Sequence, residues 1–194
     1  MRRLVVVEFL SLDGVMQAPG DPFEDPEGGF AHGGWQAPYF DESLMAAGQE
    51  GQAGTDAYLF GRKTYEIMAG YWPGAPPDDP FAAHLNETVK YVASRKHPTL
   101  TWQNSHLIEG DVAEEVAALK AQDGKDIVVL GSGDFVQTLI AGDLVDRWSL
   151  TISPIVLGSG KRLFRHHEQP VRLDLVESHT ATTGSLVLTY EPVR

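Results

Sequence analysis

Short apolar runs, separated by stretches with helical periodicity, recur along most of this sequence. Valine, isoleucine, leucine and aromatic residues dominate the runs, which are apolar on both faces. Strands of this kind are typical of a parallel sheet that is covered by helices on both sides. The pattern predicts strands at residues 5–7, 57–60, 91–93, 106–108, 127–130 and 148–152.

Capping residues and glycines mark the helices between these runs. Asp111 and Glu114 form an N-terminal capping pair, and Gly124 follows the end of that helix. The same kinds of signal predict further helices over 41–52, 64–69 and 134–141.

The C-terminal part of the chain has a different pattern. Residues 172–181 and 185–191 alternate apolar and polar positions around Thr182-Thr183-Gly184, which predicts an antiparallel hairpin. We therefore predict an α/β fold in three layers, with a mostly parallel, twisted sheet and an antiparallel C-terminal hairpin. Since no linker or internal repeat divides the sequence, residues 1–194 are expected to form a single domain.

Two long segments lack periodicity. Residues 18–38 are rich in proline, glycine and acidic side chains, and residues 71–80 contain four prolines. Loops of this length inside a domain commonly carry function, so both are candidates for contact with a ligand.

Composition and charge narrow the functional classes. The chain has no cysteine, so it forms neither disulfides nor thiolate metal sites, which fits a reducing compartment and leads us to expect a cytoplasmic protein. A formal net charge of −12 argues against nucleic-acid binding, which needs a basic surface. The apolar runs are too short to cross a membrane. The seven histidines, His166 and His167 among them, lack metal-binding spacing, and we expect no metal site.

Three predicted strand ends carry residues suited to binding an anion. They are followed by Gly61-Arg62-Lys63-Thr64, by Ser94-Arg95-Lys96 and by Gly131-Ser132-Gly133-Asp134-Phe135. In parallel α/β sheets, ligands bind beyond the carboxyl ends of the strands. Backbone N–H groups at a helix N-terminus favour a phosphate there, and neighbouring cations add to the attraction. Four of the fifteen lysines and arginines lie at two of these strand ends in an otherwise acidic chain.

Each of these motifs, taken alone, is also explained by an ordinary turn. The run from Gly131 departs from the dinucleotide fingerprint because Val136 occupies the position of its last glycine. Gly158-Ser159-Gly160-Lys161-Arg162 is not a phosphate loop: Ile155 stands at the required first glycine, and Arg162 replaces the hydroxyl residue that binds magnesium.

Taken together, the motifs resemble the dihydrofolate reductase superfamily, and within it the reductase domain of the bifunctional riboflavin-biosynthesis deaminase-reductase and its stand-alone relatives. The resemblance rests on motifs that occur in the family's order along nearly the whole chain: Ser11-Leu12-Asp13-Gly14, residues 61–66, Ser94-Arg95, residues 131–133, and residues 146–148 running into 154–164. It implies a dihydrofolate reductase-like fold, NADPH as the cofactor and a homodimer.

The resemblance also implies roles for the strand-end residues. Gly61, Arg62, Lys63 and Thr64 belong to the part that contacts cofactor phosphates, and Ser94 and Arg95 hold the ribose 2′-phosphate. The pyrophosphate is wrapped by the third strand end, namely Gly131, Ser132, Gly133, Asp134 and Phe135.

The substrate side is less defined by the sequence. Asp13 and Asp41 are the candidate catalytic acids, with a turn residue and a helix N-cap as the respective alternatives. Trp35 and Tyr39 are candidate substrate contacts, the alternative being a loop anchored by one buried tryptophan. Because the chain has neither the zinc deaminase half of the riboflavin enzyme nor the helix-centred acid of true dihydrofolate reductases, neither of those substrates is implied.

We therefore expect an NADPH-dependent reductase that transfers hydride to a small heterocyclic substrate, pterin- or pyrimidine-like, or to a carbonyl substrate. The alternatives are a non-catalytic nucleotide- or ligand-binding protein on the same fold, and a flavin- or other nucleotide-using protein on a general α/β scaffold.

Overall fold

The computed structural model describes residues 1–76, 78–165 and 170–193, so that His166 and His167 lie outside the described residues. The chain divides into two compact units, one of residues 1–5 and 48–145, the other of residues 6–47 and 146–194. Strand β1 (Leu4–Ser11) contributes residues to both. The eight strands of the sheet follow the order β4-β3-β2-β5-β1-β6-β8-β7. That residues 1–194 fold as a single domain stays a prediction.

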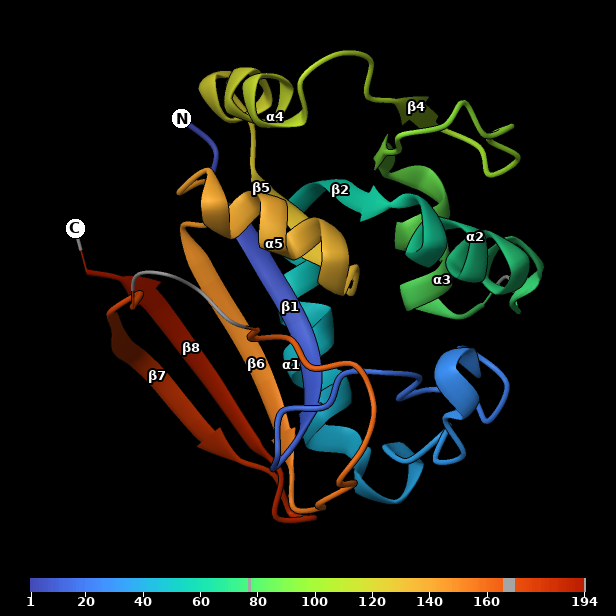
Figure 1. Ribbon diagram of the computed structural model, residues 1–194, viewed down its shortest axis with the longest axis vertical. Helices are drawn as coiled ribbons and strands as arrows, with labels where there is room; N and C mark the ends of the chain where they lie inside the picture. The colour runs from blue at the N-terminus through green and yellow to red at the C-terminus, as the bar shows by residue number, and fades with distance from the viewer. Residues whose placement is uncertain (77, 166–169, 194) are drawn as a thin grey trace. The chain divides into compact units, whose positions relative to one another are not determined.

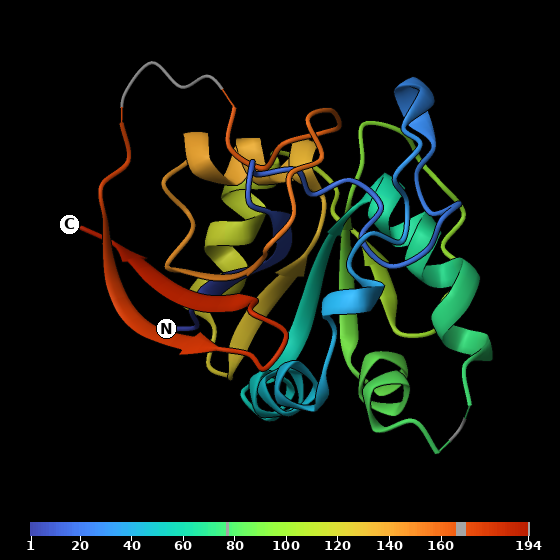
Figure 2. The ribbon, with the colours of Figure 1, turned by 90° about the horizontal axis from the view of Figure 1, so that it is seen from below.

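The first unit contains four parallel strands, as the apolar runs predict (Figure 1). They are β2 (Thr55–Gly61), β3 (Val89–Ala93), β4 (Ser105–Leu107) and β5 (Asp126–Leu130). Leu59, Phe60, Ile127 and Val129 are fully buried, because these strands have helices on both faces. Figure 2 shows α3 and α5 on opposite sides of them.

Three helices of the first unit lie where the sequence predicts them, to within two residues at each end, and one was not predicted. They are α2 (Arg62–Tyr71), α3 (Pro80–Glu87), α4 (Val112–Ala121) and α5 (Gly133–Ala141). Asp111 caps α4 as predicted. Helix α3 was missed because residues 71–80 resemble an uninterrupted loop, yet Asp79 caps the helix and Pro80 occupies its first turn.

A buried lysine joins helix α3 to strand β3. The Nζ of Lys90 donates to the carbonyl oxygens of Leu85 at 2.6 Å and Thr88 at 2.7 Å, and it lies 4.5 Å from the centre of the Trp102 ring. The C-terminal carbonyls of a helix carry partial negative charge, so a cation is favourable there. This contact ties the start of β3 to the end of α3.

The second unit holds the predicted antiparallel hairpin, drawn in red in Figure 2. Strands β7 (Leu173–Thr180) and β8 (Leu186–Pro192) pair antiparallel, and β8 also pairs antiparallel with β6 (Arg147–Ser153). Helix α1 (Glu42–Ala53) starts in this unit. The predicted loop over 18–38 contains the 3-10 turn η1 (Glu27–Gly29), and a second turn, η2 (Ala37–Tyr39), begins at its end.

Within the part of the chain that the structure describes, no helix has both the length and the apolar character needed to cross a membrane.

Candidate functional site

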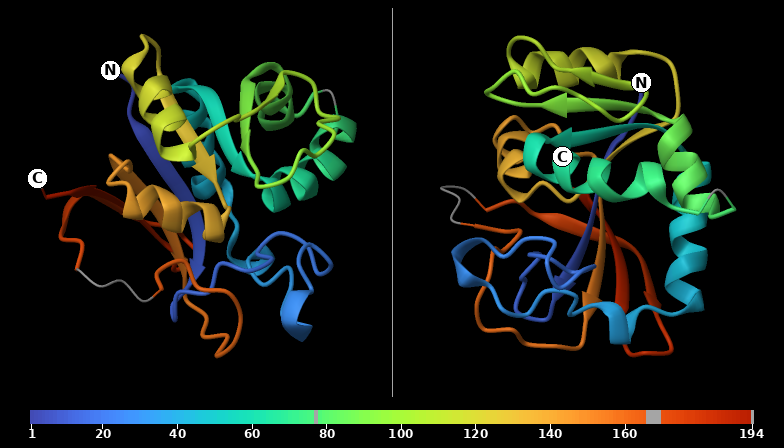
Figure 3. Two further views of the ribbon diagram at one scale, coloured as in Figure 1. Left: turned by 45° about the horizontal axis from the view of Figure 1, so that its top comes forward. Right: turned by 90° about the vertical axis from the view of Figure 1, so that its right-hand side faces the viewer.

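Three strand ends lie next to one another along the edge of the first unit's sheet. In the parallel register, Gly61 at the end of β2 pairs with Ala93 at the end of β3. Leu59 pairs with Val129, so β5 ends at the same level. Figure 3 shows α2 (green) starting where β2 (teal) stops. The structure therefore brings together all three motifs that the sequence singled out.

The ends of β2 and β5 touch directly. The backbone N–H of Gly61 donates to Oγ of Ser132 at 2.8 Å. A Cβ atom at Gly61 would come within 3.1 Å of the Phe135 Cβ, and one at Gly131 within 3.2 Å of the Thr64 Cγ2. A side chain at either position would have to displace its neighbour by a few tenths of an ångström, and at Gly131 the positive φ of 64° favours glycine in addition.

The turn after β5 has an unusual backbone. Gly131 and Ser132 both adopt the left-handed conformation, with φ of 64° and 73°. For a residue with a Cβ this costs about 1–2 kcal/mol, and such conformations gather at functional sites. The hydrogen bond from Gly61 helps to hold Ser132 in place.

The helices that follow two of these turns lack side-chain caps. Gly61, which precedes α2, has no side chain, and the side chain of Ser132, which precedes α5, accepts no hydrogen bond from the first turn. In contrast, α3 and α4 are capped by the carboxylates of Asp79 and Asp111. The N-cap residues of α2 and α5 therefore form no side-chain capping bond, and the dipole at a helix N-terminus favours an anion there.

Cationic side chains surround these helix starts. Arg62 is partly exposed and forms an ion pair with Glu66 at 2.7 Å, while Lys63 is exposed. Arg95 is exposed just beyond β3. The Oγ of the preceding Ser94 accepts the backbone N–H of Lys96 at 3.0 Å, which leaves its hydroxyl hydrogen to donate. The arrangement is suited to bind a ligand with several phosphate groups.

In the second unit, Asp13 is saturated with hydrogen bonds. Its carboxylate accepts the Ser11 hydroxyl at 2.7 Å and the backbone N–H groups of Leu157 at 3.0 Å and Gly158 at 2.9 Å. Arg162 approaches it at 3.3 Å. These bonds to the charged form, chiefly that from Leu157, lower the pKa of Asp13 to about 2. Asp13 therefore holds the turn after β1 against residues 157–162 as a permanent anion.

Asp41 occupies the N-cap position of helix α1. Its Oδ1 accepts the Leu44 N–H at 3.0 Å and the Ser43 hydroxyl at 2.6 Å, and its Oδ2 accepts the N–H of Thr182 at 3.0 Å. The hydrogen bonds from Ser43 and Thr182 hold the pKa of this carboxyl well below its ordinary value. The N-cap alternative thus describes its geometry, with an added contact to the hairpin turn.

Trp35 and Tyr39 both lie in ordered parts of the long acidic segment. The Trp35 ring is buried and its Nε1 donates to the carbonyl of Gln17 at 2.9 Å, so it anchors the loop. The Tyr39 carbonyl accepts the Thr183 hydroxyl at 2.9 Å. Their roles as substrate contacts stay predictions.

The acidic segment owes its order to two residues that the sequence reasoning passed over. Gln17 is buried and donates to the carbonyls of Asp25 at 2.9 Å and Glu27 at 3.0 Å, while its Oε1 accepts the Lys161 N–H at 3.0 Å. The Lys161 ammonium pairs with the carboxylates of Asp25 and Glu27. The signal that could have indicated this contact is the excess of acidic residues in the proline-rich loop, which needs cationic partners from elsewhere in the chain.

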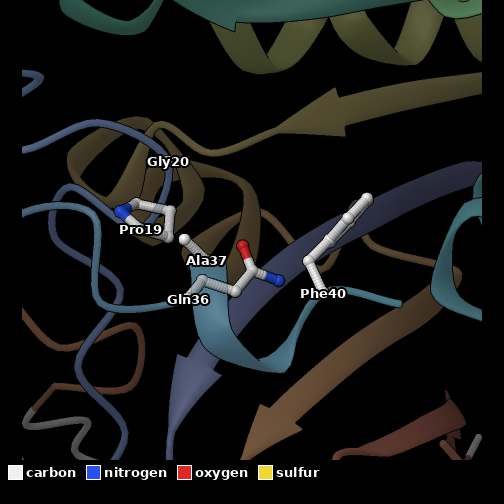
Figure 4. Close-up of a pocket in the computed structure, with 5 residues that line it drawn as sticks. All are labelled: Pro19, Gly20, Gln36, Ala37 and Phe40. Carbon is white, nitrogen blue, oxygen red and sulfur yellow. The ribbon is translucent and has the colours of Figure 1, made fainter. Parts of the chain in front are cut away.

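A hollow of about 380 Å³ opens on the second unit. It is lined by Pro19, Gly20, Gln36, Ala37 and Phe40, whose side chains gather around it in Figure 4. Phe40 also makes an edge contact with Phe9 of β1, with ring centres 6.5 Å apart. Gln36 had no distinguishing signal in the sequence, because a single glutamine in a loop is unremarkable.

Comparison with known proteins places this geometry in a family. The chain is 34% identical over 140 residues to the uncharacterized protein YyaP of Bacillus subtilis (strain 168), covering 70% of this chain and 73% of YyaP. It is 27% identical over 120 residues to the uncharacterized protein YwjB of the same organism, covering 62% of this chain and 64% of YwjB.

Three solved structures share the fold at low sequence identity. A candidate riboflavin biosynthesis protein of Shewanella sp. PV-4 superposes with a TM-score of 0.70 at 20% identity, covering 99% of both chains. A pyrimidine reductase-like protein of Corynebacterium diphtheriae gives 0.66 at 15% identity, covering all of this chain and 92% of its own.

The third is the Thermotoga maritima diaminohydroxyphosphoribosylaminopyrimidine deaminase/5-amino-6-(5-phosphoribosylamino)uracil reductase, with a TM-score of 0.64 at 14% identity. The match covers 99% of this chain and 57% of the Thermotoga chain. The fold of our chain is therefore that of the riboflavin-type, dihydrofolate reductase-like proteins, as the motifs predict. Since the family model for the RibD C-terminal domain matches residues 2–187, nearly the whole sequence, this chain belongs to the RibD C-terminal domain family.

Proposed function

We propose that this protein is an NADPH-dependent reductase of a small pyrimidine- or pterin-like heterocycle. The observation that carries the proposal is the alignment of three strand ends: the turns after β2 and β5 meet, and cationic side chains follow β2 and β3. The reductase named in the Thermotoga relative acts on a pyrimidine, which supports this substrate class.

The residues at the strand ends suit the phosphate groups of a dinucleotide. Gly61, Thr64 and the turn over 131–135 would hold the pyrophosphate, because a Cβ atom at Gly61 or Gly131 would press on neighbouring atoms and bare backbone can approach a ligand closely. Ser94 and Arg95 would bind the 2′-phosphate, the group that distinguishes NADPH from NADH.

When bound, the nicotinamide ring supplies the hydride. The two carboxylates that we considered as catalytic acids are ionised at neutral pH, because every hydrogen bond they receive favours the charged form. In this proposal Asp13 and Asp41 therefore act as hydrogen-bond acceptors that position the loops of the second unit, and neither donates a proton.

A cofactor titration tests the proposal. We expect the purified protein to bind NADPH more tightly than NADH by at least about tenfold, since one charge-assisted pair at the 2′-phosphate is worth about 1.5–3 kcal/mol. Binding is followed through the fluorescence of the reduced nicotinamide and by calorimetry. An absence of binding at high micromolar NADPH would contradict the proposal. NADPH binding without turnover of any pyrimidine or pterin would favour a non-catalytic binding protein.

We further propose a cytoplasmic homodimer that binds neither nucleic acid nor membranes. The support for a dimer comes from β7, the edge strand of the sheet. Its residues Leu175 and Val176 are 55% and 53% exposed. An edge strand with exposed apolar side chains is suited to pair with a second copy.

Substitution on β7 tests the dimer. The double variant Leu175→Lys/Val176→Lys is expected to elute as a monomer where the unchanged protein elutes as a dimer, because charged side chains block pairing at a strand edge. The measurement is size-exclusion chromatography with light scattering. Met45→Lys, at a similarly exposed apolar residue of α1, is the matched control and should leave the dimer intact. A monomeric unchanged protein would overturn the proposal.

A further inference from the structure

The hollow beside the acidic segment combines an apolar wall with one buried amide. Phe40 is 46% exposed, which leaves a ring face for a ligand to cover, and Pro19 and Ala37 supply further apolar surface. Gln36, in contrast, is only 6% exposed, and its carboxamide lies between Ala37 and Phe40 (Figure 4). Small-molecule sites commonly have this composition, with mostly apolar walls and a few placed polar groups.

Two hydrogen bonds hold the backbone of Gln36. The N–H of Gln36 donates to the Pro19 carbonyl at 3.1 Å, and the Gln36 carbonyl accepts the Tyr39 N–H at 2.8 Å. The first of these bonds joins two residues that line the hollow. The backbone of Gln36 is therefore held beside the hollow, and the side-chain torsions set the direction of the carboxamide.

The Nε2 of Gln36 has no hydrogen-bond acceptor among the described residues. A buried donor without a partner costs about 1–3 kcal/mol. The last torsion of a glutamine side chain is broad, so the amide can turn its donor or its acceptor toward a ligand in the hollow. A ligand that satisfies this amide would relieve that cost.

We propose that Gln36 determines substrate specificity by pairing with the cyclic amide edge of a flat heterocycle that lies against Phe40. A carboxamide presents one donor and one acceptor side by side, which matches the adjacent C=O and N–H of a lactam ring such as uracil. Phe40 then covers the ring face. This inference rests on the proposed reductase function, for which it names the substrate class and the residue that recognises it.

The test uses two uracils that differ at one ring nitrogen. 1-Methyluracil keeps the amide edge, whereas 1,3-dimethyluracil has no ring N–H. In a 15N-edited NMR titration of the full chain, 1-methyluracil is expected to shift the side-chain amide signal of Gln36, and 1,3-dimethyluracil is expected to leave it in place. The signal is assigned by its absence from the Gln36→Met variant.

Gln36→Met also tests whether the residue has only a structural role. Methionine has a similar length and no polar group to leave unpaired, so the variant should keep or raise the melting temperature. Its affinity for 1-methyluracil should fall by about tenfold or more, the loss of a hydrogen bond in a desolvated site. Gln49→Met, at an exposed position of α1, is the control and should bind as the unchanged protein does.

Two results would overturn the inference: equal binding of 1-methyluracil by the unchanged protein and Gln36→Met, or no binding of 1-methyluracil at millimolar concentration. NADPH titrations of the same samples distinguish failure of the Gln36 inference from failure of the proposed function. The proposed NADPH contacts lie at the ends of β2, β3 and β5 and do not include Gln36. If the unchanged protein does not bind NADPH, the proposed reductase function is contradicted.

Discussion

Replacing Arg95 with glutamate is expected to weaken NADPH binding by about 10- to 100-fold and to change NADH binding far less. Arg95 is exposed just beyond β3, at the strand end that pairs with the end of β2. A guanidinium facing a phosphate forms charge-assisted hydrogen bonds worth about 1.5–3 kcal/mol, and reversing the charge replaces attraction with repulsion. The measurement is the ratio of the two dissociation constants, obtained by calorimetry.

The neighbouring Lys96 provides the control for this experiment. Lys96→Glu makes the same change of charge one residue away, at an exposed position of the same strand end that is not assigned to the 2′-phosphate. It should weaken NADPH binding modestly, through the general field, and the effect should shrink as salt is added. Equal losses for NADPH and NADH in Arg95→Glu would show that Arg95 does not recognise the 2′-phosphate.

Replacing Glu8 with glutamine is expected to stabilise the folded protein at pH 7–8 by about 1–3 kcal/mol. Glu8 lies in strand β1, is 3% exposed, and its Oε1 has no hydrogen-bond donor among the described residues. Burial raises the pKa of this carboxyl well above its ordinary value, since the charged form loses its hydration. Above the ordinary pKa of 4.5, folding must either protonate this carboxyl or bury its charge, a cost that glutamine does not have.

The stability gained by Glu8→Gln is expected to depend on pH, in a direction set by the raised pKa. A carboxyl whose pKa is raised on folding contributes its full stability below the ordinary pKa near 4.5 and loses it as pH rises through the raised value. The gain from Glu8→Gln should therefore vanish toward pH 4 and grow as pH increases. Chemical denaturation across this range measures it.

Other groups titrate in the same pH range, so the comparison with the unchanged protein is essential. Burial lowers the pKa of His84, which makes the protein more stable as pH rises, opposite to Glu8, but His84 is present in both proteins. Glu50→Gln, at an exposed position of α1, is the matched control and should change stability little at any pH. A Glu8→Gln variant that is less stable at pH 8 would contradict the prediction.

Much of the fold could be read from local pattern, and particular elements explain why. The apolar runs predicted the parallel strands because a strand covered by helices on both faces buries mostly apolar side chains, the buried Lys90 of β3 being an exception. The alternation of apolar and polar residues on both sides of the turn at 182–184 predicted the hairpin. Helix α3 escaped because the prolines before it indicate a loop, and only the Asp79 cap marks its start.

The strand-end motifs were determined by the sequence, since glycines, cations and helix starts are local features. That they lie together was decided by the register of β2 with β3 and β5, and the space at Gly61 and Gly131 is limited by close contacts with Phe135 and Thr64. No local pattern contains those partners, which are far apart along the chain.

The acidic residues illustrate the same division. Asp13 and Asp41 were recognisable as polar residues near strand and helix ends, but their functions as hydrogen-bonded anchors depend on Leu157, Gly158 and Thr182, more than 140 residues away. Gln36 became a candidate for substrate recognition only when packing buried it without an acceptor. Sequence by itself determined which chemical groups the chain carries and in which elements they lie. Tertiary structure alone decided which of them are already paired and which still need a partner, because hydrogen bonding and desolvation depend on neighbours in space.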